Sequence, residues 1–448
     1  GLEDKVFTGN EEDAKQTPGS YRLTLNDVVL RESGSAGDVP GDYVVEYSGI
    51  SKAGTATIIF RGINEYTGQL KKTYKITGCQ INSEEGGIGA GFRMEYYTQD
   101  APDRFREITD LSQITTPYVK GGSKPGVVLF YNGMKLISGK DYTVKYANNN
   151  GITPAAAEGQ ELDEKKLPRI TVTGKGSFKG SFSGIFKITD GAMSQTNAGE
   201  SEGDSEGGAG KGKVSMTAKD VVYKNRKNAW KSTVTLTDCN GAKLSAGKDY
   251  DRNLAFTYEK DAYVFVEDKA GAASVKDVGT ESAGTDGGNS GEGNGTDNGV
   301  ILKKAGSPVQ PEDIPQAGTV IRVTAFGKGC YAGTGDTAAS VSAVYRITTA
   351  DISRARVTVQ AQEYLNGHEI KLTEADIKVT MSGSSEPLIY GRDYVIDEST
   401  YANNRNKGKG SVVIRGIDQD GTGNYGGEKK ITFTIGAKLL VWWKNLFW

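Results

Sequence analysis

Short runs of alternating apolar and polar residues occur along most of the chain, and turns rich in glycine and asparagine separate them. In one such run Tyr142, Val144 and Tyr146 share a face, which is the period-two pattern of a strand buried on one side. The asparagine pairs at 148–149 and 403–404 predict tight turns rather than ligand sites, because asparagine tolerates positive φ. Two other runs, residues 42–47 and 55–60, flank a turn-forming stretch and predict a β-hairpin. The content of Val, Ile, Thr and Tyr, without a long helix-forming stretch, predicts an all-β fold.

Several phrases recur four times in the same order. A glycine precedes an Asp-Tyr pair that opens a strand-like run, at Asp42 and Tyr43, Asp141 and Tyr142, Asp249 and Tyr250, and Asp393 and Tyr394. Each copy is followed by a second motif, the Gly-aromatic phrase, in which glycines flank an aromatic residue. That residue is Tyr66, Phe178, Tyr331 or Tyr425. Each unit closes on an aromatic, polar, isoleucine triplet ending at Ile76, Ile188, Ile347 or Ile435, and opens with an aromatic residue at Phe7, Tyr118, Tyr223 or Tyr364. This recurrence predicts a tandem array of four units.

The repeats predict four domains, because 448 residues are too many for one core. Their expected ranges are 1–77, 78–190, 213–350 and 351–436, with an aromatic tail at 437–448. Residues 191–212 are acidic and rich in Gly and Ser, so a flexible linker is expected. A similar segment at about 270–299 predicts a disordered insert in the third domain, and residues 78–116 form an insertion or an elongated first-strand region in the second.

Composition narrows the choice of partners. With 54 basic and 56 acidic side chains the net charge is −2, so no global field favours nucleic acid or an anionic membrane surface.

The three cysteines, Cys79, Cys239 and Cys330, are far apart in the sequence. Their spacing predicts neither a disulfide framework nor a zinc site, and Cys330 is expected to be a half-buried filler. No signal peptide is visible at the start, so a leader was removed or the sequence starts internally.

The order of these phrases resembles bacterial immunoglobulin-like repeats of the MBG-like type, which occur in tandem in surface proteins of Gram-positive bacteria. Residues 139–150 and 170–188 carry the clearest match, and the third repeat is degenerate. The resemblance implies an Ig-like two-sheet β-sandwich in each repeat, extracellular display, and a stalk or adhesive role. The sequence departs from such proteins in lacking an LPxTG-like sorting signal and a cell-wall-binding repeat.

Catalysis is hard to build from these residues. His368 is the only histidine, so Ser/His/Asp, Cys/His and multi-histidine metal sites lack essential groups, and we expect it exposed in a hairpin. Paired carboxylates could serve a glycosidase, but the four repeated aspartates recur with the fold and are expected to accept local backbone hydrogen bonds. The acidic stretch at 285–297 lacks regular calcium-loop spacing. We therefore expect no catalytic residue, cofactor or metal ion.

The C-terminal segment is the most unusual local chemistry, since three of the four tryptophans fall in the last seven residues. Aromatic residues dominate interfaces, so we predict partner binding by Trp442, Trp443, Phe447 and Trp448. Three interpretations stay open: the segment docks on the fourth domain or a neighbouring molecule, it anchors at a membrane interface, or it continues into something larger.

The sequence as a whole predicts a non-enzymatic extracellular or cell-surface protein, a stalk or adhesin that contacts protein or glycan. One alternative is an accessory or carbohydrate-binding region of a secreted carbohydrate-active enzyme, and another is a structural subunit of a fibre or virion decoration. Glycan-array binding together with hydrolysis assays separates the first two, and concentration-dependent polymerisation would mark the third.

Overall fold

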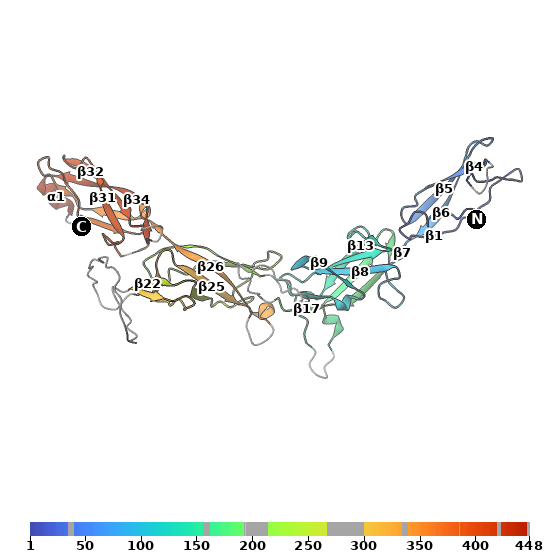
Figure 1. Cartoon of the computed structure of the whole chain (residues 1–448), viewed down its shortest axis with the longest axis horizontal. Coiled ribbons are helices and arrows are strands. Elements are labelled where there is room, and N and C mark those ends of the chain that lie inside the picture. Colours follow the sequence, from blue (N-terminus) through green and yellow to red (C-terminus); the bar gives the residue numbers. More distant parts are fainter. Residues whose placement is uncertain are drawn as a thin grey trace, which may run out of the picture. The chain divides into compact units, whose positions relative to one another are not determined.

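The computed structural model consists mainly of β-strands (Figure 1). Among the described residues it contains one α-helix, α1 (Lys438–Asn445). The structure describes residues 1–34, 40–155, 162–191, 193, 214–266, 300–333, 339–384, 386–418 and 423–445. The predicted all-β fold class is therefore confirmed. The predicted insert at 270–299, its acidic stretch at 285–297, and all of the predicted linker except residues 191 and 193 lie outside the described residues.

Two compact units make up the chain. The first contains Gly1–Ser215, Thr237–Tyr250 and Gly327–Ser340, and the second contains Met216–Leu236, Asp251–Phe326 and Val341–Trp448. Repeats one and two lie in the first unit, repeat four lies in the second, and the residues of repeat three are divided between them. The boundaries of four separate domains stay a prediction.

The first repeat contains a four-stranded sheet in the order β1-β6-β5-β4 and a short hairpin, β2-β3. Its strands are β1 (Lys5–Val6), β2 (Thr24–Leu25), β3 (Val28–Val29), β4 (Tyr43–Ser48), β5 (Gly54–Gly62) and β6 (Gln69–Thr77). Strands β4 and β5 are antiparallel, with Glu46 opposite Ile59, which confirms the predicted hairpin. Alternate residues of β5, namely Ala56, Ile58 and Phe60, are buried, as period-two packing requires.

The second repeat contains two larger sheets, β12-β11-β8-β9 and β13-β14-β16, and two parallel pairs, β10-β17 and β7-β15. Its strands are β7 (Cys79–Gln80), β8 (Phe92–Thr98), β9 (Ala101–Ile108), β10 (Thr115–Pro117), β11 (Gly126–Tyr131), β12 (Met134–Lys135), β13 (Tyr142–Ala147), β14 (Arg169–Gly174), β15 (Phe178–Lys179), β16 (Ser181–Ile185) and β17 (Lys187–Thr189). Tyr142, Val144 and Tyr146 of β13 pack into the core, which confirms their predicted shared face. The segment 78–116 supplies β7 to β9 and the first two residues of β10.

The third repeat contains the sheets β19-β26-β25-β21, β23-β22-β24 and β18-β20. Its strands are β18 (Ser215–Ala218), β19 (Val221–Val222), β20 (Val234–Thr237), β21 (Ala255–Tyr258), β22 (Ala262–Val266), β23 (Val300–Lys303), β24 (Asp313–Pro315), β25 (Val320–Phe326) and β26 (Ser340–Thr348). The sheet β23-β22-β24 lies between the Asp-Tyr and the Gly-aromatic phrases. The predicted excursion at this place thus includes ordered strands on either side of residues 267–299.

The fourth repeat contains the sheets β29-β34-β32-β31 and β28-β30, and the parallel pair β27-β33. Its strands are β27 (Ala350–Asp351), β28 (Arg356–Val359), β29 (Gln362–Glu363), β30 (Ile377–Thr380), β31 (Tyr394–Ala402), β32 (Gly408–Gly416), β33 (Tyr425–Gly426) and β34 (Glu428–Gly436). Short 3-10 turns complete the described chain at Leu111–Gln113, Glu164–Lys166, Gly329–Tyr331, Ile352–Arg354 and Glu374–Asp376.

The predicted asparagine turns are present in repeats two and four. Asn148 and Asn403 adopt φ of 54° and 56°, a left-handed conformation that asparagine tolerates. The next residue in each turn, Asn149 or Asn404, is buried and donates its side-chain amide to the carbonyl of Ser123 or Ile370, at 3.0 and 2.9 Å. These asparagines therefore shape the fold, as the sequence predicts.

Candidate functional site

In every Asp-Tyr phrase the aspartate carboxylate accepts a hydrogen bond from nearby backbone. Each carboxylate accepts a hydrogen bond from a backbone N–H in the preceding loop, at 2.7 to 2.8 Å, from Arg31 to Asp42, Ile137 to Asp141, Ser245 to Asp249 and Ile389 to Asp393. This is the structural role predicted for repeated aspartates. The following tyrosines are buried in all four repeats.

The opening aromatic of one repeat packs against the Gly-aromatic phrase of the next. The three edge-to-face pairs have ring centroids 5.4 to 5.5 Å apart and are Phe7 with Phe178, Tyr118 with Tyr331, and Tyr223 with Tyr425. Their interplanar angles of 77° to 87° are the geometry that aromatic quadrupoles prefer. Two phrases that only marked the repeat in the sequence thus meet at the junctions between repeats.

A backbone hydrogen bond accompanies each aromatic pair. The residue three positions after the closing isoleucine donates its N–H to the carbonyl just before the Gly-aromatic residue, at 2.9 Å, from Cys79 to Ser177, Gly191 to Cys330 and Ala350 to Asn424. At two junctions this contact extends into a parallel ladder, β7-β15 and β27-β33. The aromatic pairs therefore join consecutive repeats, and the hydrogen bonds hold the segment that follows each closing triplet against the next Gly-aromatic phrase.

Glycine is required beside the aromatic residue because the loop folds back tightly on itself. A Cβ on Gly174 would lie 2.8 Å from the backbone of Phe178, and one on Gly416 would lie 2.6 Å from the backbone of Tyr425. Both distances are shorter than real Cβ contacts allow. The glycines of the phrase thus permit the turn that presents the aromatic ring to the preceding repeat.

Charged groups reinforce the junction between repeats two and three. The Lys120 ammonium donates to the Asp249 carboxylate at 2.6 Å and to the Lys243 carbonyl at 2.7 Å. The Lys120 backbone N–H and the Tyr331 hydroxyl both donate to Asp238, which is buried. Burial, together with the hydrogen bond to Asp238, raises the pKa of Tyr331 well above the ordinary tyrosine value. Because charge-assisted hydrogen bonds are strong when partly buried, they stabilise the contact at this junction.

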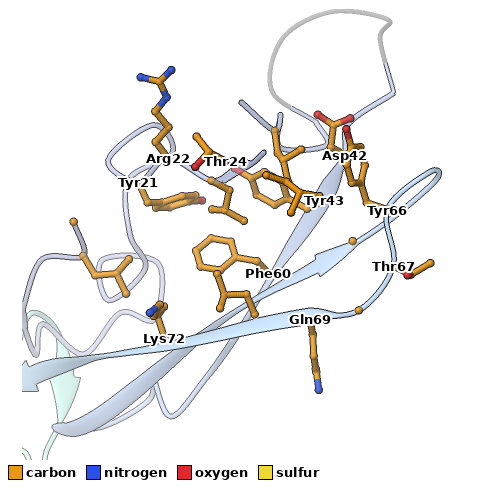
Figure 2. Close-up of a pocket in the computed structure, with 18 of the residues that line it drawn as sticks. Tyr21, Arg22, Thr24, Asp42, Tyr43, Phe60, Tyr66, Thr67, Gln69 and Lys72 are labelled. Atoms are coloured by element: carbon orange, nitrogen blue, oxygen red, sulfur yellow. The ribbon is translucent and has the colours of Figure 1, made fainter. Parts of the chain in front are cut away.

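In the first repeat, no opening aromatic residue of the described chain packs against the Gly-aromatic phrase. Phe178, Tyr331 and Tyr425 are 1 to 3 % exposed, whereas Tyr66 of the first repeat is only half-buried. Tyr66 lines a cleft of about 900 Å³ together with Tyr21, Leu23 and Phe60. Figure 2 shows the rings of Tyr21, Tyr43 and Phe60 pointing into this cleft. In the described residues, the Gly-aromatic phrase of the first repeat thus lines a cleft that carries both apolar and polar side chains.

The predicted aromatic tail forms helix α1, which contacts the fourth repeat. The side-chain amide of Asn445 donates to the Ala361 carbonyl at 3.0 Å and accepts from the Ala361 N–H at 2.9 Å. Trp442 and Trp443 are 60 and 66 % exposed, so the contact with the repeat leaves both indoles open to a partner. Phe447 and Trp448 lie outside the described residues. Partner binding by the four aromatic residues stays a prediction.

The remaining candidate groups show no assembled chemistry. His368 is exposed beside a turn, and Cys330 is half-buried, as the sequence predicts for both. Cys79, Cys239 and Cys330 are free thiols. Within the described ranges, no group of three or more His, Cys, Asp or Glu side chains is placed to hold a metal ion. No helix in the same ranges has the length and apolar character needed to cross a bilayer.

Comparison with known proteins gives only distant likenesses. Neither a protein-family model nor a curated protein matches the sequence. Among solved structures, protocadherin gamma B2 extracellular cadherin domains 3–6 share 10 % identity over 86 % of this chain and 83 % of that chain, with a TM-score of 0.16. The protocadherin gammaB7 EC3-6 cis-dimer shares 10 % identity over 90 % and 92 %, with a TM-score of 0.16. The M60 catalytic domain with two CBM51 domains from Clostridium perfringens ZmpB shares 11 % over 88 % and 40 %, with a TM-score of 0.14.

Proposed function

We propose that the protein is a non-enzymatic stalk of MBG-like Ig-like repeats that is displayed outside the cell and presents an adhesive surface to protein or glycan. The observation that carries this proposal is the junction: three aromatic pairs with nearly the same geometry join successive repeats, and a backbone hydrogen bond from the connecting segment accompanies each pair. A stalk benefits from such contacts, because interfaces between neighbouring repeats stabilise a repeat array and limit free rotation between its units.

The exposed indoles of Trp442 and Trp443 are the best supported contact surface. Large aromatic side chains in water favour burial against a partner, and tryptophan is enriched among residues that dominate binding energy. Both lie on a helix that Asn445 anchors to the fourth repeat, so the repeat positions them. A protein surface or a sugar ring would stack on these faces.

The test is binding by the full chain to glycan and matrix-protein arrays, with hydrolysis assays on every glycan that binds. We expect saturable binding to at least one array member, without cleavage, and a loss of at least tenfold in the double variant Trp442→Ala/Trp443→Ala. Tyr263→Ala is the matched control because its ring is also 60 % exposed. Glycan cleavage would favour an enzyme, and equal binding by the double variant would move the contact surface elsewhere.

A further inference from the structure

A cleft with a cationic lining lies where the third and fourth repeats meet, inside the second compact unit. Its volume is about 480 Å³, which is in the range of ligand pockets. The lining includes one carboxylate, Asp220, and five cationic side chains, which are Lys219, Lys224, Arg226, Lys231 and Arg354. Because the whole chain has a net charge of −2, this cationic cleft concentrates positive charge that the overall composition does not predict.

The five cations are open to a ligand. All of them are exposed, and none forms an ion pair with a carboxylate of the described residues. The Lys231 ammonium lies 5.6 Å from the centre of the Trp230 ring. The Asp220 carboxylate accepts a hydrogen bond from the Arg346 N–H at 2.7 Å, so the single acid of the lining is held by backbone. Since like charges around one cleft repel each other, a bound anion would relieve this repulsion.

The segment 219–231, which carries four of the cations, is held by the fold at both ends. At its start β19 pairs in parallel with β26, and the Tyr223 N–H donates to the Thr348 carbonyl at 2.7 Å. At its end Trp230 is 4 % exposed, and its carbonyl accepts from the Tyr345 hydroxyl at 2.8 Å. The charged side chains are therefore attached to a fixed backbone, which lowers the ordering cost of binding.

The fourth repeat supplies the opposite wall, with Arg354 and the turn at 381–384, which carries two serine hydroxyls. Two aromatic residues also line the cleft, Tyr223 and Tyr425. They are 4 and 3 % exposed and pack against each other at 5.4 Å. Among the described lining residues there is thus no exposed aromatic face on which a nucleic-acid base could stack, whereas cations and hydrogen-bonding groups are present.

We propose that this cationic cleft binds a sulfated polysaccharide. Five cations around one small cleft match closely spaced anionic groups, which a chain sulfated on successive sugars supplies. The guanidinium groups of Arg226 and Arg354 can each hold two oxygens of one sulfate, and the lysines act as point charges. The serine hydroxyls of the turn at 381–384 can bond to sugar hydroxyls. The site does not include the indoles of α1.

The probe is a fluorescent heparin tetrasaccharide, added to the full chain and followed by anisotropy at about 50 and about 200 mM salt. We expect saturable binding that is at least tenfold weaker at the higher salt, because the interaction is ionic. The same tetrasaccharide without its sulfates should bind at least tenfold more weakly. A single-stranded oligonucleotide of equal charge should also bind at least tenfold more weakly, since its bases find no stacking face.

The variant Lys219→Gln/Lys224→Gln should weaken binding of the sulfated probe at least tenfold, because it removes two of the five cations and changes exposed side chains only. The matched control is Lys71→Gln/Lys75→Gln, which removes two exposed lysines from β6 of the first repeat and should bind as the unaltered chain does. An equal loss in this control would show that the ligand responds to total charge and would overturn the proposal.

The double variant Trp442→Ala/Trp443→Ala should keep full binding of the sulfated probe, so failure of this site is distinguishable from failure of the proposed adhesive surface. Loss of binding in that variant would place the ligand on α1 and overturn the proposal. Absence of saturation, binding that does not depend on sulfate, equal binding of the oligonucleotide, or unchanged binding by Lys219→Gln/Lys224→Gln would each overturn it as well.

Discussion

Phe178 offers the sharpest test of the junctions. Its ring is 2 % exposed and contacts Phe7 of the first repeat at 5.5 Å and Tyr131 of its own repeat at 5.7 Å. Truncation of a buried phenylalanine to alanine costs about 3–5 kcal/mol, because transfer free energy is lost and a cavity remains. Tyr66 is the equivalent residue of the first repeat, and since it is half-buried we expect Tyr66→Ala to cost only about 1–2 kcal/mol.

The part of this cost that belongs to the junction comes from a double-mutant cycle. An edge-to-face pair contributes about 0.5–1.5 kcal/mol beyond its buried area, so Phe7→Ala and Phe178→Ala should couple by that amount. Native-state hydrogen exchange read by mass spectrometry is the suitable assay, because it reports each repeat of a multidomain chain separately. Exchange should accelerate in both β6 and β14. A coupling near zero, or a Phe178→Ala cost no larger than that of Tyr66→Ala, would refute the reasoning.

Three further outcomes are expected. Lys120→Ala leaves the buried Asp249 carboxylate without its cation and should cost about 1–3 kcal/mol. Lys15→Ala removes an exposed ion pair and should leave stability nearly unchanged in the same hydrogen-exchange measurement. Gly174→Ala should lower the melting temperature, because its Cβ would collide with the turn backbone; an unchanged melting temperature would contradict the assigned close approach. Burial raises the pKa of Tyr394 to about 12, so the folded state holds this proton more tightly than the unfolded state does. The resulting stabilisation is complete below pH 10 and is lost as pH rises toward 12; Tyr394→Phe should therefore show a smaller drop in urea midpoint between pH 7 and pH 11.

The sequence predicted the elements that depend on local chemistry. Alternation fixed the inward face of β13, the asparagine pairs specified left-handed turns, and the repeated aspartates were expected to bond to nearby backbone. Each of these features involves residues within a few positions or on adjacent strands. The sheet β23-β22-β24 was not predicted, because its strands are short and stand on either side of a long glycine-rich segment.

The contacts at the junctions could not be predicted from the sequence, for a different reason. Phe7 and Phe178 belong to different repeats, and no spacing rule links an opening aromatic of one unit to a Gly-aromatic phrase of the next. The signal was nevertheless present, since both phrases keep an aromatic residue in all four repeats although each appeared to serve its own unit. A residue type that recurs without a function inside its own repeat is a candidate for contact with a neighbouring one.

The exposures of the four Gly-aromatic residues support this interpretation. If the aromatic residue served only its own sandwich, Tyr66 would be as buried as Phe178, because the strands that hold them correspond closely. Instead Tyr66 is half-buried, and the three residues that meet an opening aromatic are almost fully covered. The burial of this position is therefore supplied from outside the repeat.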